Sequence, residues 1–364
     1  MRRLDLNSRK DISDEDVQLI IKSMPNVTEL LLRSTKVGDK GMENIDKLKH
    51  LEVLNLAGTQ VSDSAMPAIG KLERLGLLNL SNCSITDKGF KHLSGLKYIE
   101  ELRLDGTWVS DTGLEDLSIR FPALARFTSS LWITDKGLKE IGRLPELKYL
   151  NISRNQITTL KELSKTPNLE WLDVSGSALT SLEGIGNPPK LLRLDLTGTS
   201  IRSLKGIESA SKLETLILRH SKVTDDGLAP LGLLANLVDI DLSETSVTDI
   251  GLSHIAKMKN LKALQLSFAK ITDKGLAEVA NHSRLQRLDI SRTELTDDGL
   301  RQVSRLSALE RLSLNGSNVS DRGLEHLVGM KSLKFLWLVN TNVTEKGVKT
   351  LRSRLPNTEI LWPN

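Results

Sequence analysis

The sequence has a single cysteine, few aromatic residues and no long hydrophobic segment. Among its 364 residues Cys83 is the one thiol, and aromatic residues make up 3%. One cysteine excludes a disulfide framework and a thiolate metal cluster. The longest apolar segment, residues 228–238, is interrupted by Pro230 and Asn236. It is therefore too short to form a membrane-spanning helix.

An excess of charge of one sign is also lacking. Fifty Lys and Arg residues face 46 Asp and Glu residues, which gives a net charge of +4, and the two signs alternate along the chain. Nucleic acid or acidic lipid would call for a block of positive charge, so we expect neither as a partner. No basic and apolar leader precedes the first patterned segment. These features favour an intracellular protein, and the alternative is a bacterial envelope or secreted location from which a leader was removed.

The motifs that carry catalysis or cofactor binding are missing as well. His92, His254 and His326 share one helix position in the third, tenth and thirteenth repeats. At about 4.8 Å per stacked strand the closest two should lie roughly 14 Å apart, so they predict no metal or acid–base cluster. The Gly-Ile-Gly segment at residues 184–186 is followed by Asn-Pro-Pro, which cannot begin the helix of a dinucleotide-binding motif. No phosphate-binding loop and no Gly-x-Ser-x-Gly motif occurs. We therefore expect no catalytic residue, no metal and no cofactor.

What the sequence does contain is a repeat. An L-x-x-L-x-L pattern returns about every 24 residues, and alternating leucines such as Leu54 and Leu56 place both side chains on one face of a short strand. A partial unit at residues 3–6 precedes the full units, and residues 360–362 follow them. The fourteen full units begin at Val27, Leu51, Leu75, Ile99, Leu124, Leu147, Leu169, Leu191, Leu213, Leu237, Leu261, Leu285, Leu309 and Leu333.

Each strand is followed by a turn and then by the start of a helix. The turn carries a small polar residue, such as Thr59 or Cys83, which can pair with backbone groups that leave the strands. Next comes Thr/Ser-Asp-x-Gly-Leu, and we predict that its Asp, such as Asp87, is the helix N-cap. The sequence does not explain the glycine two residues later. Apolar residues spaced like Phe90 and Leu93 would then seat the helix on the strands.

This strand, turn and helix pattern resembles the leucine-rich repeat family. The Thr-Asp-x-Gly-Leu helix start is similar to the variant in F-box-type and bacterial leucine-rich repeat proteins, and the resemblance extends from Leu4 to Leu361. It implies an α/β fold: a right-handed solenoid, or horseshoe, with a parallel β-sheet on the concave face and helices and 3₁₀ turns on the convex face. It also implies an adaptor, receptor or effector role without choosing among them.

We expect one solenoid domain over residues 1–364. It comprises a partial N-terminal repeat or cap (1–26), five repeats of about 24 residues (27–146), three of 22 residues (147–212), six of about 24 residues (213–357) and a partial strand (358–364). The three short repeats lack the Asp-x-Gly-Leu start, which predicts tight 3₁₀ turns. The repeat at Leu124 lacks one residue, either as a tolerated deletion or as a bulge that redirects side chains. Both ends are thinly covered, which favours flanking domains or a partner at one end.

The strand residues between the leucines should point to the concave face, where the scarce aromatic residues gather. Tyr149 and Trp171 share one column in consecutive repeats, Arg193 follows in that column, and Asp173 and Asp195 lie beside them. Large rings next to an arginine are typical of binding hot spots, and exposed rings lower solubility. We predict a patch that binds a protein or peptide. The alternative is that the rings only cover strand backbone.

Two further aromatic groups occur. Phe335, Trp337 and Trp362 lie on the last full strand and the partial strand after it, where they either close the end of the solenoid or contact a partner. Trp108 and Trp132 share a position just after the turn in neighbouring repeats. We predict that these two rings stack along the rim and extend the first patch.

These observations predict a non-catalytic protein–protein interaction module that binds its partner on the concave face. Two alternatives remain. The first is the substrate-recognition arm or effector subunit of an enzymatic, ubiquitin-ligase-like assembly, which would need a second docking surface at one end. The second is a structural or surface protein that self-associates end to end through Phe335, Trp337 and Trp362.

Overall fold

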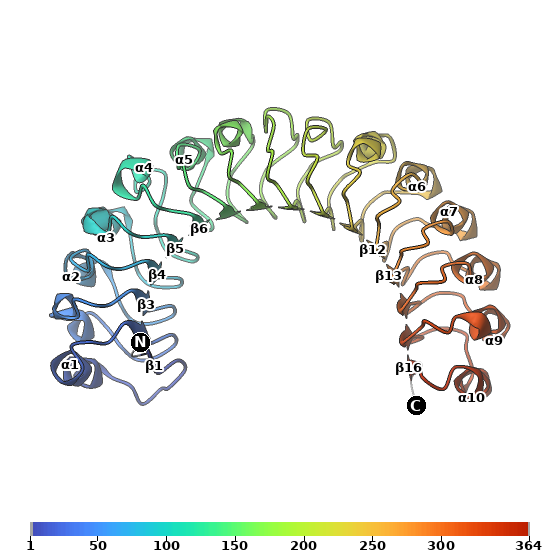
Figure 1. The fold of residues 1–364 in the computed structure, drawn as a ribbon, viewed down its shortest axis with the longest axis horizontal. Coiled ribbons are helices and arrows are strands. Elements are labelled where there is room, and N and C mark those ends of the chain that lie inside the picture. Colours follow the sequence, from blue (N-terminus) through green and yellow to red (C-terminus); the bar gives the residue numbers. More distant parts are fainter. Residues whose placement is uncertain (1–2, 363–364) are drawn as a thin grey trace. The chain divides into compact units, whose positions relative to one another are not determined.

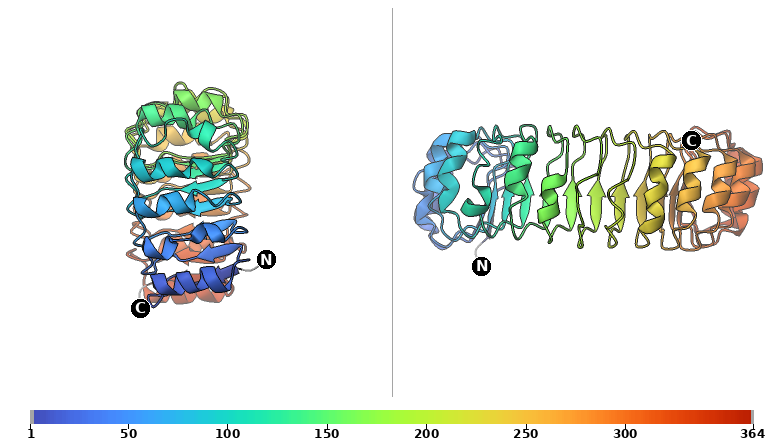
Figure 2. Two further views of the ribbon diagram at one scale, coloured as in Figure 1. Left: turned by 90° about the vertical axis from the view of Figure 1, so that its left-hand side faces the viewer. Right: turned by 90° about the horizontal axis from the view of Figure 1, so that it is seen from above.

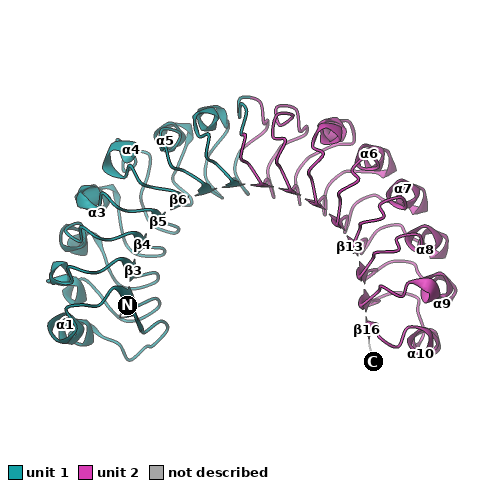
Figure 3. Ribbon diagram, viewed as in Figure 1, with its two compact units in different colours: residues 1–178, 184–188 teal, residues 179–183, 189–364 magenta. Residues whose placement is uncertain are grey.

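Each predicted repeat folds into a short strand, a turn and a further segment that is helical in most repeats (Figure 1). The computed structural model describes residues 3–362. Within each unit the strands form one layer, and the helical segments form a second layer along one face of it (Figure 2). The chain divides into two units (Figure 3): unit 1 comprises residues 1–178 and 184–188, and unit 2 comprises residues 179–183 and 189–364.

The strands of each unit are parallel and lie side by side in chain order. Those of unit 1 are β1 (Arg3–Asp5), β2 (Glu29–Leu31), β3 (Val53–Asn55), β4 (Leu77–Asn79), β5 (Glu101–Arg103), β6 (Arg126–Thr128), β7 (Tyr149–Asn151) and β8 (Trp171–Asp173). Those of unit 2 are β9 (Arg193–Asp195), β10 (Thr215–Ile217), β11 (Asp239–Asp241), β12 (Ala263–Gln265), β13 (Arg287–Asp289), β14 (Arg311–Ser313), β15 (Phe335–Trp337) and β16 (Glu359–Leu361).

The period-two pattern explains which side chains enter the core. Leu54, the middle residue of β3, and Leu56 just after that strand are fully buried, whereas Val53 and Asn55 are partly exposed. We call the side on which the first and third strand residues project the strand face of a unit. The leucines point the other way and fill the space between the strands and the helical segments. The predicted α/β solenoid architecture is confirmed.

The helical segments are short, and several are 3₁₀ helices. In unit 1 they are α1 (Asp14–Ser23), η1 (Lys40–Met42), η2 (Ile45–Lys47), η3 (Asp63–Ala65), α2 (Met66–Ile69), α3 (Asp87–Lys91), η4 (His92–Gly95), α4 (Leu117–Arg120), α5 (Asp135–Ile141) and η5 (Lys161–Lys165). In unit 2 they are η6 (Asp226–Leu233), α6 (Asp249–Ile255), α7 (Asp273–Val279), α8 (Asp297–Val303), α9 (Asp321–Leu324), η7 (Glu325–Gly329) and α10 (Glu345–Arg354).

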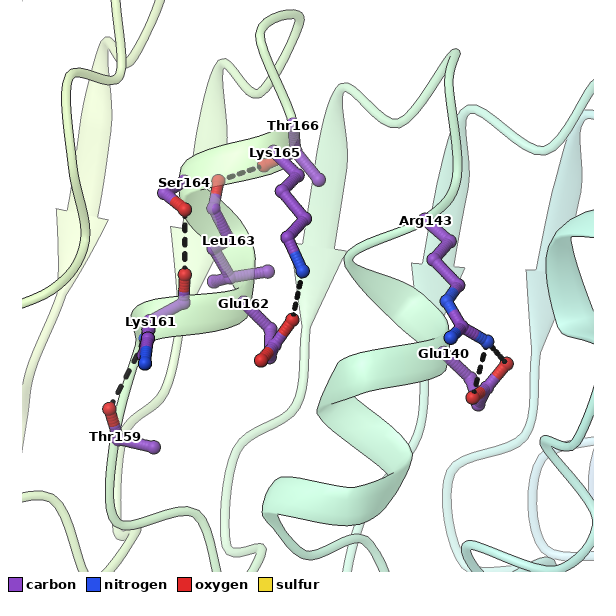
Figure 4. A network of polar contacts seen from close by, with 9 residues as sticks. All are labelled: Glu140, Arg143, Thr159, Lys161, Glu162, Leu163, Ser164, Lys165 and Thr166. Atoms are coloured by element: carbon purple, nitrogen blue, oxygen red, sulfur yellow. Dashed lines mark hydrogen bonds and ion pairs between the residues drawn. The ribbon is translucent and has the colours of Figure 1, made fainter.

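The short repeats lose the α-helix, as predicted, but only the first of the three has the predicted 3₁₀ helix. The first of them has the 3₁₀ helix η5, and residues 166–225 contain no helix. Side chains of η5 hold its single turn (Figure 4): Lys165 pairs with Glu162 at 2.6 Å, and the Ser164 hydroxyl donates to the Lys161 carbonyl at 2.8 Å. Two residues fewer leave room for a tight turn but not for a full helix.

The prediction that the repeated Asp is the helix N-cap is wrong for most repeats; Asp39 and Asp225 do precede η1 and η6 at the N-cap position, but neither makes a side-chain cap hydrogen bond. In α3 the N-cap is Thr86, whose hydroxyl accepts from the backbone N–H of Lys88, and Asp87 is the first helical residue. The carboxylate reaches instead to the next repeat: Asp87 accepts from the backbone N–H and the hydroxyl of Ser110, both at 2.7 Å. This bond fixes the cap residue of the next repeat. We call the series the carboxylate ladder, and it comprises Asp39, Asp63, Asp87, Asp111 and Asp135 in unit 1 and Asp225, Asp249, Asp273, Asp297 and Asp321 in unit 2.

The ladder also explains the repeated glycine. A Cβ atom added to Gly89 would overlap the carboxylate of Asp63 in the preceding repeat. The same conflict with a ladder residue arises at Gly113, Gly137, Gly251, Gly275, Gly299, Gly323 and Gly347. The glycine is therefore required where the carboxylate of one repeat passes close to the helix start of the next.

Small polar residues occupy the turns as predicted. The Thr59 hydroxyl donates to the Leu56 carbonyl at 2.7 Å, and the buried Cys83 thiol donates to the same carbonyl at 3.0 Å. Burial raises the pKa of Cys83, which disfavours its thiolate form. Leu131 occupies the turn position at which most repeats have a small polar residue. The turn is irregular there, with a φ of 92° at Leu131. The amide of Asn155 then bridges the gap, donating to the Ser129 carbonyl at 2.9 Å.

Candidate interaction surface

Two aromatic rings stack closely against each other on the strand face of unit 1. Tyr149 and Trp171 are the first residues of β7 and β8 and pair in register. Their ring centroids lie 3.9 Å apart with an angle of 6° between the planes. Both side chains are half-buried. The predicted shared column is confirmed, and the rings form a stacked pair instead of two separate exposed groups.

Arg126, which the sequence analysis missed, extends this stack by one strand. Its guanidinium lies 4.3 Å from the centre of the Tyr149 ring, as the first residue of β6. Glu101 holds it through an ion pair of 3.2 Å and also accepts from Arg103 at 2.6 Å. An arginine over an aromatic face is attracted by the ring quadrupole. We call Arg126, Tyr149 and Trp171 the aromatic row. Burial raises the pKa of Tyr149, which disfavours its phenolate form.

Polar side chains run beside the aromatic row. Asp173, the third residue of β8, accepts from the Asn151 amide at 3.1 Å and from the backbone N–H of Ser175 at 2.9 Å. These bonds fix its carboxylate next to the two rings. The aromatic row therefore occupies one column of the strand face, and the polar side chains of Asn151 and Asp173 occupy the column beside it.

Two of the residues predicted for the same patch lie in unit 2. Arg193 and Asp195 are the first and third residues of β9 and belong to that unit's strand face. Asp195 accepts from the backbone N–H of Thr197 at 3.0 Å and from its hydroxyl at 2.6 Å.

A second aromatic pair lies beyond the ends of the strands in unit 1. Trp108 and Trp132 stack with centroids 5.3 Å apart and an angle of 29°, which confirms the predicted contact. They are 60% and 41% exposed, and the neighbouring Leu131 is 45% exposed. Three large apolar side chains are thus available to solvent next to the irregular turn.

The aromatic residues near the C-terminus have different positions. Phe335 and Trp337, on β15, stack with centroids 5.9 Å apart, and the Arg311 guanidinium lies 4.9 Å from the Phe335 ring. Trp362 instead donates its indole N–H to the Val343 carbonyl at 3.0 Å. Phe335 and Trp337 therefore belong to the strand face of unit 2, whereas Trp362 ties the last segment to the preceding turn.

One exposed ring in unit 2 escaped the sequence analysis. Phe268 is 52% exposed in a turn with φ of 61°, a conformation that bulky residues rarely adopt. The Arg292 guanidinium lies 5.0 Å from its ring centre. The sequence signal for this irregular turn was the neighbouring Ala269, which stands where most repeats have a hydroxyl side chain.

Asp241 on the strand face of unit 2 is expected to make the free energy of unfolding depend on pH. Burial raises its pKa, although the backbone N–H of Ser243 donates to it at 2.8 Å. A raised pKa in the folded state means that stability falls as pH rises through the unfolded-state value of about 3.9. We expect Asp241→Asn to melt at a higher temperature than the wild type at pH 7, and the difference to vanish below about pH 3. Thermal melts across this range test it, and a constant difference would contradict it.

The described part of the chain shows neither a metal cluster nor a membrane span. Within residues 3–362, no three His, Cys, Asp or Glu side chains are grouped so that they could hold a metal ion. Over the same residues, every helix is too short or too polar to cross a bilayer.

Parallel one-strand repeats with a leucine core define a leucine-rich repeat solenoid. The family model described as "Leucine-rich repeat region" matches residues 124–355, and a model described as "Leucine Rich repeat" matches residues 47–70. The chain belongs to the leucine-rich repeat family. This fold is typical of protein–protein interaction modules, which are generally non-catalytic. A search of curated proteins finds no match.

Solved structures with the same fold come from several sources. A leucine-rich repeat protein of Leptospira interrogans is 23% identical, with a TM-score of 0.73 over 99% of this chain and 95% of that one. An internalin from Listeria monocytogenes is 21% identical, with a TM-score of 0.68 over 95% and 93%. The plant peptide hormone receptor RGFR1, in complex with RGF2, is 20% identical, with a TM-score of 0.59 over 93% of this chain and 55% of that one.

Proposed function

We propose that this chain is a non-catalytic interaction module whose unit 1 binds a protein or peptide on its strand face through the aromatic row. The observation that carries the proposal is the nearly parallel stack of Tyr149 and Trp171, covered by an arginine that Glu101 holds in place. Rings fixed in advance lose little side-chain entropy when a partner binds. RGFR1, which has the same fold, is a peptide hormone receptor, and this supports the class of partner.

Other predicted contacts have supporting roles in the proposal. Asp173 offers a fixed acceptor beside the rings of unit 1. Trp108 and Trp132 offer an exposed apolar edge in the same unit. The remaining predicted contacts, which we assign to the strand face of unit 2 by itself, are Arg193, Asp195, Phe335 and Trp337.

The test is a pull-down from lysate of the source cells with three baits. These are the wild type, the double variant Tyr149→Ala/Trp171→Ala, and Leu19→Ala as a matched control, because Leu19 is 61% exposed on α1 in the helical layer. Hot-spot residues contribute at least about 2 kcal/mol, so we expect the double variant to bind the captured protein about 30-fold more weakly.

The purified partner is then titrated against each bait by calorimetry, and circular dichroism checks that every bait is folded. Retention of the same proteins by all three baits, with equal affinity, would refute the role of the aromatic row.

A further inference from the structure

Gly76 borders the strand face of unit 1, and no close contact requires it to be glycine. It immediately precedes β4, its φ is not positive, and a Cβ atom there would come no closer than 3.7 Å to another group, the Glu52 carbonyl oxygen. The repeated glycines such as Gly89, by contrast, have no room for a side chain. Glycine in an extended segment loses about 0.5–1 kcal/mol relative to alanine. It often marks a place where a ligand approaches the backbone.

An open hollow of about 710 Å³ surrounds Gly76. Its backbone floor is part of the strand ladder: Gly76 donates its N–H to the Glu52 carbonyl, and its own carbonyl accepts from the N–H of Glu100, both at 2.8 Å. The small Ala125 lines the same hollow. The space therefore results from missing side chains over a regular backbone. We call it the Gly76 hollow.

The charges around the hollow favour a cation. Glu52 and Glu100 hold the same strand position as Gly76 in the preceding and the following repeat, so they stand about 10 Å apart on either side of it. Both residues are exposed, and within residues 3–362 neither carboxylate has a hydrogen-bond or ion-pair partner. Tyr98, which is 67% exposed, also lines the hollow. Carboxylates and an aromatic face both attract a positive charge.

The two arginines of the lining reduce the negative excess without removing it. Arg126 is paired with Glu101. Arg74 contacts the His50 ring at 3.4 Å and is a single cation beside two unpaired carboxylates. An apolar side chain placed between Glu52 and Glu100 would desolvate both carboxylates without replacing their water. An acidic one would be repelled.

We propose that the Gly76 hollow takes a lysine or arginine side chain of the partner, held between Glu52 and Glu100 and against the Tyr98 ring. This inference rests on the proposed function. Arg126 connects the two places, because it lines the hollow and covers Tyr149. From β4 to β8 the strand face extends about 19 Å, which an extended segment of about six residues spans.

The probe is a phage-displayed library of random 12-residue peptides, selected on the immobilised full chain. Enriched peptides are synthesised and titrated against the wild type, Gly76→Phe, which fills the hollow, and Gly76→Ala as the matched control. The double variant Glu52→Gln/Glu100→Gln removes both negative charges and keeps the size of the side chains. Trp171→Ala removes one ring of the aromatic row. Circular dichroism and melting temperature verify that each variant is folded.

We expect the enriched peptides to contain Lys or Arg. Their affinity should fall at least about tenfold with Gly76→Phe and with the Gln variant, and stay within about twofold with Gly76→Ala. Replacing the peptide's Lys by norleucine should remove the difference between the wild type and the Gln variant. Binding should also weaken as salt rises.

Three results would overturn the inference. Peptides that lose affinity with Trp171→Ala but not with Gly76→Phe or the Gln variant would refute the subsite and leave the proposed function standing. Peptides that depend on Gly76 without needing a cation would refute the chemistry. No enrichment of peptides over an uncoated support would count against both proposals. Peptides whose affinity depends on the Gly76 hollow but not on Trp171 would support the subsite and contradict the role of the aromatic row.

Discussion

Gly323→Ala is expected to lower the free energy of unfolding of unit 2 by about 1–3 kcal/mol, the usual effect of overpacking a filled site. The new Cβ atom would overlap the Oδ1 of Asp297 and lie 3.1 Å from its Cγ. That carboxylate accepts from the backbone N–H and the hydroxyl of Ser320 at 2.7 and 2.6 Å. To make room, either these bonds or the start of α9 must shift. The midpoint of urea unfolding measures the loss.

The same repeat provides the control. Gly329, six residues further on, has nothing within 4 Å of an added Cβ atom, so Gly329→Ala should be neutral or stabilise by up to about 1 kcal/mol. Asp297→Ala removes the carboxylate that the new Cβ atom of Gly323→Ala would overlap. In the Asp297→Ala background, Gly323→Ala should therefore lower the free energy of unfolding only slightly further, so the two losses are not additive. Equal losses at Gly323 and Gly329 would contradict the steric explanation.

The ladder also shows why the sequence predicted the repeat but misassigned its Asp. A strand is local, so the spacing of Leu54 and Leu56 was enough to place it. The partner of Asp87 is Ser110, in the next repeat, and the conflict that excludes a side chain at Gly113 involves that same Asp87. Rules for helix caps consider only residues within one turn, and both interactions lie outside that range.

The candidate surface was predictable to the extent that the repeat period sets the strand register. Tyr149 and Trp171 lie 22 residues apart at matching positions, and this fixed them side by side. Arg126 holds the same strand position one repeat earlier, yet the sequence carries no signal for which of several arginines covers a ring. The Gly76 hollow was missed because it consists of absent side chains, whereas a search of the sequence looks for chemical groups.

The largest expected loss of stability is at Phe127, the middle residue of β6. Its register partners on β5 and β7 are Leu102 and Leu150, and its ring is fully buried. Phe127→Ala should lower the free energy of unfolding of unit 1 by about 3–5 kcal/mol, because the ring's contacts are lost and a cavity remains. Urea unfolding measures it, with Leu19→Ala, an exposed site on α1, as the control that should change little. A loss below about 1 kcal/mol would show that the site collapses around the smaller residue.

The large Phe127 has a small neighbour in the core. The next inward position of this repeat holds Ser129, where the adjacent repeats have Leu104 and Ile152, and the buried Ser129 hydroxyl has no partner among the described residues. If the ring fills the volume that serine leaves, then Phe127→Leu opens a gap and Ser129→Leu overpacks the site. Each change alone should destabilise by about 1–3 kcal/mol. The double variant restores the pattern of the neighbouring repeats, and we expect it to be more stable than either single variant, within about 1 kcal/mol of the wild type. Additive losses would show that the two positions are not coupled through a shared volume.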